Sequence, residues 1–170
     1  MDGTLATIYL IAGVFDMGAT HCATGCLARQ DADRRLTLQA GSVLFQDAAI
    51  GDELYLGYDL RQARGPFQPT LGLSVSDLGD TWIGLGVKTR FEIGHEGWFA
   101  EGSVMPGYHD AGTGPDLGGS FQIRSSLGLG YEFDNGGALS LLFDHRSNAD
   151  TQSLNPGMET ISIRYSMAFD

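Results

Sequence analysis

Three residues near the C-terminus have the types and the spacing that ester hydrolysis requires. His145 and Ser147 are two positions apart, and Glu159 follows Ser147 by twelve positions, after an Asn-Pro-Gly segment. Residues two apart on a β-strand point to the same side, so the imidazole and the hydroxyl would be neighbours, about 7 Å apart at Cα. A histidine can take the proton of a serine that attacks an acyl carbon, and a carboxylate can orient the histidine.

A hairpin of two strands would bring the carboxylate to the histidine. If His145 lies opposite Glu159, the apolar stripes of the two strands also come opposite each other. The resulting pairs are Phe143 with Ile161, Leu141 with Ile163, and Leu139 with Tyr165. Directly opposed Cβ atoms lie about 5 Å apart. The sequence therefore predicts that Glu159 lies within reach of the imidazole.

All three reactive residues share the apolar face of their strands. By parity, His145 and Ser147 point to the side of Leu141, and Glu159 points to the side of Ile161. Polar groups on a lipid-facing surface are costly unless they are paired, and they mark functional sites. A lone His-x-Ser on a strand is common and usually without function, so the prediction depends on the register and the shared face together. Such a site suits a membrane lipid better than a water-soluble substrate.

Eight runs with period-two alternation follow Arg35 and would form the strands that position these residues. They cover residues 36–46, 52–62, 67–76, 80–93, 96–107, 119–133, 137–147 and 157–169. Turn residues separate the runs, and Asn135-Gly136 is a strong hairpin signal because a type I′ turn needs positive φ at both positions. The 25 glycines and only 10 Lys plus Arg also favour strands and turns over helices.

One face of these runs is apolar, while the other mixes glycine with polar and charged residues. In run 119–133 the apolar face holds Phe121, Ile123, Leu127, Leu129, Tyr131 and Phe133, interrupted by Ser125. A membrane barrel turns its apolar face outward, and glycines on the inner face let a narrow barrel close. Aromatic residues near run ends would form interfacial girdles: Trp82, Trp98, Tyr108, Tyr131 and Phe169. The pattern predicts an all-β, eight-stranded antiparallel up-and-down transmembrane β-barrel.

Composition excludes several classes of function. The 170 residues fit one domain, and the net charge of −11 makes the chain a poor nucleic-acid binder, since phosphate contacts need clustered Lys and Arg. No pair of C-x-x-C motifs and no H-E-x-x-H occurs, so neither a metal nor another cofactor is expected. Two cysteines, Cys22 and Cys26, cannot build a disulfide-based fold. His21, His95 and His109 fall in the leader or in turns and are interpreted as solvated.

Residues 1–28 are expected to form a signal or leader segment, and residues 29–170 a single β-barrel domain. The apolar stretch 8–15 is too short to span a bilayer as a helix, which needs about 20 residues, but it suits a secretory signal. The alternative is a short ordered N-terminal arm with a bridge between Cys22 and Cys26.

The segment His145-Arg146-Ser147-Asn148, its spacing to Glu159 and the Asn155-Pro156-Gly157 approach resemble the lipid A 3-O-deacylase (PagL-type) family. The resemblance is specific over residues 139–169 and architectural over 36–138. It implies an eight-stranded barrel of the bacterial outer membrane that acts as a serine esterase. Its substrate would be lipid A of lipopolysaccharide, from which it removes the 3-O-linked acyl chain.

The resemblance also implies roles for individual residues. Ser147 would be the nucleophile, His145 the general base and Glu159 the orienting acid. Asn148 and Asn155 would stabilise the oxyanion or order a loop. Lipopolysaccharide and outer-membrane lipid are the expected partners, nucleic acid is not expected, and a homodimer is left open.

Two other interpretations remain open at this point. The first is a non-enzymatic small outer-membrane barrel of the structural or adhesion type, and the second is a soluble lipid-binding β-barrel. Arg146 has the opposite parity from the three reactive residues, so it is expected to face the lumen or a loop.

Overall fold

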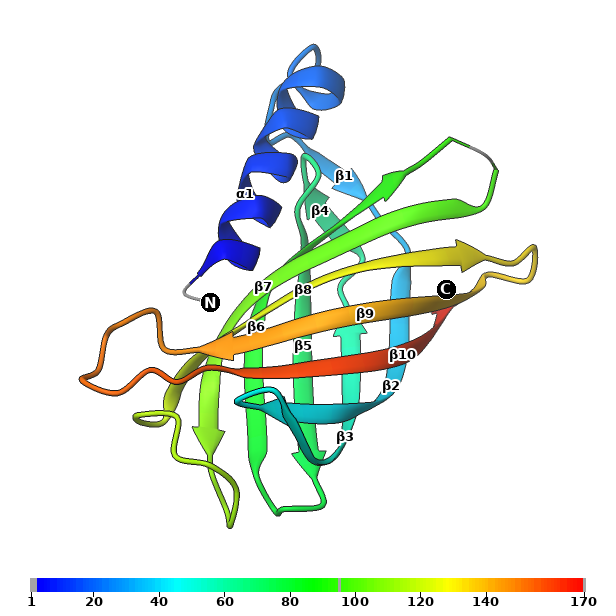
Figure 1. Ribbon diagram of the computed structural model, residues 1–170. Coiled ribbons are helices and arrows are strands. Elements are labelled where there is room, and N and C mark those ends of the chain that lie inside the picture. Colours follow the sequence, from blue (N-terminus) through cyan, green and yellow to red (C-terminus); the bar gives the residue numbers. More distant parts are fainter. Residues whose placement is uncertain (1–2, 95, 170) are drawn as a thin grey trace.

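A computed structural model of the chain describes residues 3–94 and 96–169. Eight antiparallel strands close into a barrel in which each strand pairs with its neighbour in the sequence and β10 pairs with β2 (Figure 1). The barrel strands are β2 (Arg34–Phe45), β3 (Ala48–Asp59), β5 (Gln68–Ser76), β6 (Thr81–Glu92), β7 (Trp98–Asp110), β8 (Phe121–Glu132), β9 (Gly137–Ser147) and β10 (Met158–Phe169). The predicted eight-stranded antiparallel up-and-down barrel is confirmed.

The second barrel strand departs most from its predicted limits. It begins at Ala48 because Gln46 and Asp47 adopt positive φ values of 50° and 66°, which makes a two-residue turn directly after β2. It also ends earlier, at Asp59. Residues 62–64 form a separate short strand, β4 (Gln62–Arg64), which pairs with β1 (Arg29–Asp31) in a two-stranded sheet of its own.

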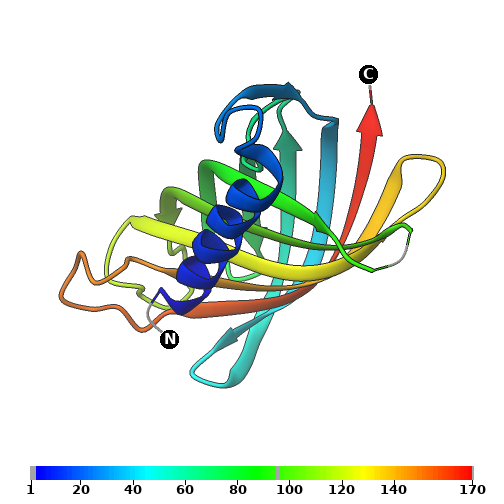
Figure 2. The same ribbon diagram turned by 90° about the horizontal axis from the view of Figure 1, so that it is seen from above.

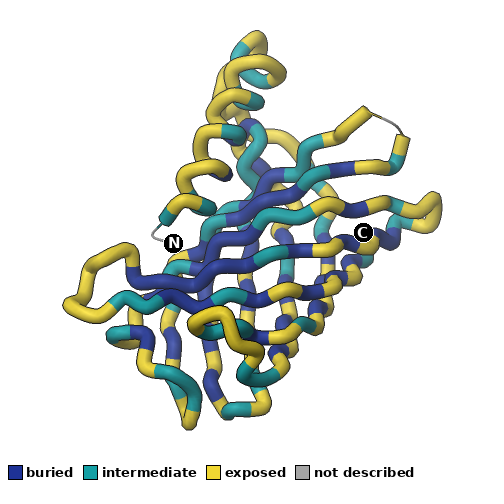
Figure 3. The backbone as a smooth tube through the Cα atoms, in the orientation of Figure 1, coloured by how far each residue is buried: buried dark blue, intermediate teal, exposed yellow. Residues whose placement is uncertain are grey.

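The outer wall of the barrel is apolar and the lumen is polar. Along each strand, exposed and buried residues alternate (Figure 3), and the exposed positions carry Leu, Ile and Val side chains such as Leu85, Leu141 and Ile163. The buried positions carry mostly glycine, polar and charged residues. This arrangement is the inverse of a soluble barrel and confirms the predicted membrane-type exposure.

Trp82 is the exception among the aromatic residues predicted to lie at the interface. Its side chain is fully buried in the lumen, where Nε1 donates a hydrogen bond to the carbonyl oxygen of Gln122 at 3.2 Å. A Cβ atom at Gly84 or Gly107 would come within 2.3 Å or 2.6 Å of the indole. The two glycines therefore make room for an inward tryptophan, and the prediction was wrong for this residue. The other four aromatic residues are exposed.

Paired charges fill the lumen. Arg124 lies 2.7 Å from Glu53, Lys88 lies 2.6 Å from Asp59, and Arg164 lies 3.1 Å from Glu101. Buried charges are costly unless they are paired, so these ion pairs offset the burial of charge on the inner face. The space beside Tyr55 and Lys88 measures about 10 Å³, roughly the room that one water needs. In the described part of the chain, the lumen around Tyr55 and Lys88 is therefore a packed core.

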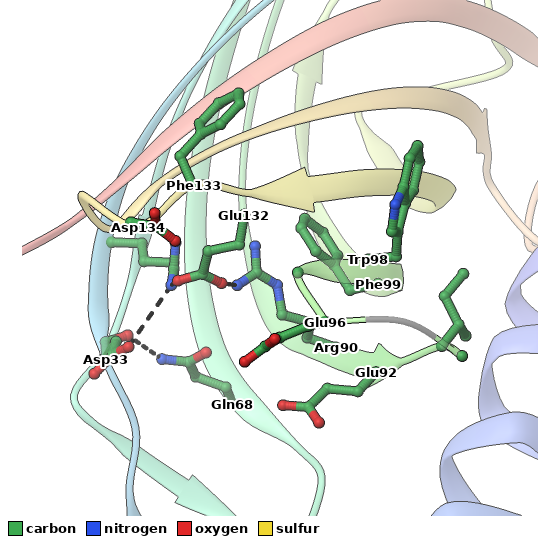
Figure 4. A pocket seen from close by; sticks show the side chains of 14 residues that line it. Asp33, Gln68, Arg90, Glu92, Glu96, Trp98, Phe99, Glu132, Phe133 and Asp134 are labelled. Carbon is green, nitrogen blue, oxygen red and sulfur yellow. Dashed lines mark hydrogen bonds and ion pairs between the residues drawn. The ribbon is translucent and has the colours of Figure 1, made fainter.

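A polar pocket of about 930 Å³ lies at the mouth of the barrel, at the end away from the β9–β10 loop. Figure 4 shows Glu132 and Arg90 facing each other in this pocket. Glu132 pairs with Arg90 and also accepts a hydrogen bond from Arg35 at 2.6 Å, while the Arg90 guanidinium lies 3.5 Å from the centre of the Phe99 ring. These contacts join β2, β6 and β8 at the mouth.

The N-terminal segment lies outside the barrel. Helix α1 (Thr4–Asp16) packs against β7 and β8 on the outer wall (Figure 2), with Tyr9 fully buried and its hydroxyl 3.0 Å from the Thr89 hydroxyl. A single π-turn, η1 (Met17–His21), and a Cys22–Cys26 disulfide follow. Among the described residues, no helix combines the length and the apolar character needed to cross a membrane. The removal of residues 1–28 as a leader stays a prediction.

Candidate active site

Strands β9 and β10 pair in the predicted register. His145 lies opposite Glu159, and the three apolar pairs behind them match as expected: Phe143 with Ile161, Leu141 with Ile163, and Leu139 with Tyr165. The side chains complete the contact, because His145 Nδ1 lies 3.0 Å from Glu159 Oε1. A carboxylate accepts a hydrogen bond from Nδ1–H, so this contact favours the tautomer that leaves the ring lone pair on Nε2. The structure therefore brings the base and the orienting acid together.

Ser147 is on the same face of β9 as His145. Both side chains are buried although they point to the outer side of the wall, while the Glu159 side chain remains 21% exposed. Nε2 of His145 is buried and has no hydrogen-bond partner among the described residues, so its bond to the Ser147 hydroxyl is not formed in this structure. Catalytic hydrogen bonds often tighten only in the substrate complex. The arrangement supplies a base with an uncommitted nitrogen beside a hydroxyl.

A second serine lies beside the imidazole. Ser125 on β8 is opposite His145, on the side of β9 away from Glu159, and it is buried on the outer face. The sequence carried a signal for it, since Ser125 is the one small polar residue that interrupts the apolar stripe of run 119–133. Its position next to His145 could be seen only in the structure, because it depends on the register between β8 and β9.

Asn148 fastens the loop that follows the serine. Its side-chain nitrogen donates hydrogen bonds to the carbonyl oxygens of Leu117 at 3.0 Å and Leu154 at 2.6 Å. Its backbone N–H donates to Asn155 Oδ1 at 3.0 Å, and Asn155 in turn donates to Asp150 at 2.8 Å. Both amide hydrogens of Asn148 are thus used within the protein, which favours the loop-ordering role over the oxyanion role.

Gly157 brings the backbone of this loop against the imidazole. Its φ of +72° is in the left-handed region, and a Cβ atom there would come within 2.8 Å of His145 Cε1. Side chains at such φ values are strained, and this one would also collide with the ring. The glycine of the Asn-Pro-Gly segment therefore defines the position of His145 from the loop side.

Arg146 points into the lumen, as its parity predicted. It pairs with Glu53 and lies 3.0 Å from Asp80, so it holds the inner side of β9 in place beneath the reactive residues. Asp80 also lies 3.9 Å from His109 Nδ1. His109 is buried in β7, so the interpretation of this histidine as solvated was wrong.

His21 belongs to the N-terminal segment and not to the site. His21 is partly exposed and its ring lies 3.2 Å from the Gln30 side chain, while His95 lies outside the described residues. Over residues 3–94 and 96–169, no three His, Cys, Asp or Glu side chains gather as metal ligands would.

Comparison with known families places this geometry in context. The family described as Lipid A 3-O-deacylase (PagL) matches residues 53–168, well over half of the chain, and the match includes all three reactive residues. The lipid A deacylase PagL of Bordetella bronchiseptica (strain ATCC BAA-588 / NCTC 13252 / RB50) is 26% identical over 108 residues, which cover 46% of this chain and 61% of that relative. The match thus spans less than two thirds of the relative's length.

Solved structures share the architecture. The crystal structure of the outer membrane enzyme PagL superposes with a TM-score of 0.66 at 18% identity, covering 79% of this chain and 99% of that one. A designed transmembrane β-barrel gives a TM-score of 0.60 at 8% identity, covering 82% of this chain and 98% of the design. Neisserial surface protein A gives 0.52 at 8% identity, covering 84% and 99%. At these identities the likeness extends to the fold.

Proposed function

Because this chain belongs to the lipid A 3-O-deacylase (PagL) family, we propose that it is an outer-membrane esterase that removes the 3-O-linked acyl chain from lipid A. The observation that carries the proposal is the 3.0 Å contact between His145 Nδ1 and Glu159 on the lipid-facing side of the barrel wall. An ester in the bilayer can approach that side without leaving the membrane. Lipid A and the surrounding outer-membrane lipid are then the partners of the barrel.

In the proposed mechanism, Ser147 is the nucleophile and His145 the general base. Nε2 takes the hydroxyl proton as Oγ bonds to the acyl carbonyl carbon, and Glu159 stabilises the imidazolium through Nδ1–H. The tetrahedral intermediate then expels the sugar oxygen, which receives the proton from Nε2. The acyl chain is now esterified to Ser147.

Water completes the cycle. It gives a proton to Nε2 as it attacks the acyl carbon, and the fatty acid leaves when Ser147 Oγ regains that proton. Asn148 and Asn155 order the loop beside these atoms. The oxyanion needs donors about 3 Å away, and the hydrogens of the Asn148 side chain are already donated to Leu117 and Leu154.

The test compares the purified barrel with its Ser147→Ala variant on lipid A. Mass spectrometry of the lipid should show loss of one 3-O-linked acyl chain with the wild type. The rate should fall by about 10³-fold or more in the variant, as expected for removal of a nucleophile.

Ser125→Ala is the matched control, because it removes a second buried serine next to His145. It should retain acyl release within about threefold. Acyl release that persists in Ser147→Ala and disappears in Ser125→Ala would contradict the proposal, because the nucleophile would then be Ser125 on β8. A wild type that releases no acyl chain would favour the non-enzymatic barrel.

A further inference from the structure

A groove of about 810 Å³ lies on the outer wall and extends from β9 across β10, β2 and β3 to β5. We propose that it binds a second acyl chain of the substrate, one that is retained while another is cleaved. This inference rests on the proposed function and adds to it a specificity site that is separate from the reacting atoms.

The groove exists because a small residue interrupts the apolar band. Along one row of paired residues, Ile163 lies opposite Ala40, Ala40 opposite Leu54, and Leu54 opposite Val75. The methyl group of Ala40 is flanked on both sides by larger side chains, so the wall is hollow there. On β2 the outward neighbour on one side of Ala40 is Leu38, which is full-sized and exposed, whereas the neighbour on the other side is Ser42, which is small.

The walls of the groove match the chemistry of an acyl chain. Leu54, Val75, Leu141, Ile161 and Ile163 line it, and each is exposed on the lipid-facing surface. An alkyl chain that lies between these side chains makes more dispersion contacts than it would on a flat surface.

The position of the groove decides which chain it can hold. Ile161 is the next outward residue after Glu159 on β10, so the groove begins on the Glu159 side of His145. Nδ1 of the imidazole faces Glu159, and Nε2 therefore faces away from it. The scissile carbonyl must reach Nε2 and Ser147, so its chain starts on the other side of the histidine. A chain in the groove is a different chain of the same lipid.

The polar end of the groove supports a lipid with its head at the loop end. Ser42, Asp52 and Asp77 lie there, with Ser42 Oγ donating to Asp52 at 2.9 Å and the Asp52 N–H donating to Asp77 at 3.1 Å. Carboxylate oxygens can accept hydrogen bonds from hydroxyl or amide groups where acyl chains join a sugar. The polar end and the reactive residues are at the same end of the barrel, since Asp77 precedes the β5–β6 turn and Ser147 precedes the β9–β10 loop.

The first experiment fills the groove with Ala40→Phe. Two substrates are compared: lipid A, which carries several chains, and p-nitrophenyl octanoate, which carries one. Displacing two methylenes should cost about tenfold or more, at about fourfold for each CH₂. We expect the ratio of kcat/KM for lipid A to kcat/KM for the single-chain ester to fall by at least that factor. Leu85→Phe adds an aromatic ring on the far wall, where the side chain is also exposed, and should leave the ratio at the wild-type value.

An unchanged ratio in Ala40→Phe would overturn the proposal, because a chain in the groove must be displaced by the ring. So would an equal fall in Leu85→Phe, since the effect would then not belong to the groove.

A second readout does not depend on turnover. In the Ser147→Ala background, the thiol of Ala40→Cys is alkylated with N-ethylmaleimide in detergent, with and without lipid A. Lipid A should slow the alkylation about fivefold or more by covering the groove, whereas the thiol of Leu85→Cys should react at the same rate in both conditions. Equal rates at Ala40→Cys would overturn the groove proposal. Shielding of that thiol by lipid A, with a wild type that releases no acyl chain, would instead overturn the proposed function and leave the groove standing.

Discussion

At the scale of single residues, the chemistry of the site depends on which nitrogen of His145 carries the proton. Glu159 accepts from Nδ1 and thereby keeps the basic lone pair on Nε2, the nitrogen that must receive the serine proton. The carboxylate does not touch the substrate in this arrangement. It acts through the tautomer and the orientation of the ring.

Glu159→Gln tests this role. A glutamine amide can donate to Nδ1 and so stabilise the tautomer whose Nε2 carries hydrogen, which cannot act as a base. We expect kcat to fall by about 10²-fold to 10⁴-fold with little change in KM, as for the analogous change in serine hydrolases. Steady-state kinetics on a soluble single-chain ester measure both quantities. A kcat within threefold of wild type would show that Glu159 does not orient the base.

Gly157→Ala tests the contact between the loop and the ring. The added Cβ atom would meet His145 Cε1 at 2.8 Å, so the imidazole must move and activity should fall by about tenfold or more. Gly79→Ala is the matched control because Gly79 has a similar φ of +75° but no atom within 4 Å of the added Cβ. Both variants should lose about 1 kcal/mol of stability from backbone strain. Equal esterase activity in the two variants would contradict the proposed contact.

The reactive residues could be predicted from sequence because a strand repeats every two residues. Once His145 was placed opposite Glu159, the three apolar pairs behind them fixed the register, since a slip of one residue would turn every side chain to the other face. The hydrogen bonds of Asn148 could not be predicted, because its partners Leu117 and Leu154 are in loops whose paths no periodicity describes.

At the scale of elements, two loops hold the end of the barrel that carries the site. Asn148 connects the loop between β7 and β8 to the loop between β9 and β10 through its bonds to Leu117 and Leu154. The loops also touch at Gly118, where a Cβ atom would lie 1.8 Å from the Leu154 carbonyl oxygen. No side chain larger than hydrogen fits at this crossing.

Asn148→Ala should therefore loosen the loops and leave the strands intact. It removes two hydrogen bonds, each worth about 1 kcal/mol, and leaves their carbonyl acceptors without that donor. Hydrogen exchange should speed up for amides 149–157 and stay unchanged in β9 and β10. Asn135→Ala in the β8–β9 turn removes a single bond, to the Gly137 N–H, at the other end of the barrel and serves as the control. Unchanged exchange in residues 149–157 would show that Asn148 does not hold the loop.

The boundaries of the strands were predicted less accurately than the strands themselves. Alternation predicted all eight barrel strands, but it continued through residues 60–62, where the chain leaves β3 to form β4. Likewise, the turn at Gln46 and Asp47 contains no glycine, so Asp47 was the one residue there whose type favours a positive φ.

At the scale of the whole molecule, the charge network in the lumen supports the wall on which the site is built. Glu53 pairs with both Arg124 and Arg146, and Arg146 is the residue between His145 and Ser147. Alternation along the strands assigned the lumen residues to the inner face. It could not identify their partners across the barrel.

Glu53→Ala should destabilise the barrel by about 3–5 kcal/mol, because it leaves two buried arginines without their shared carboxylate. The midpoint of thermal unfolding, read from the mobility shift between folded and unfolded barrel on a gel, should fall accordingly. Glu92→Ala removes an exposed carboxylate at the mouth pocket and should change the midpoint little. A midpoint that is equal in both variants would mean that the network contributes nothing to stability.

The reactive residues lie near one rim of a wall whose interior is packed, and this has a consequence for membrane asymmetry. Lipids diffuse freely in the plane of a leaflet, but they cannot pass through a lumen that is filled by side chains. A deacylase built in this way would remodel only the monolayer that reaches its rim, and both products would stay on that side. The opposite monolayer would keep its acyl composition however abundant the enzyme became.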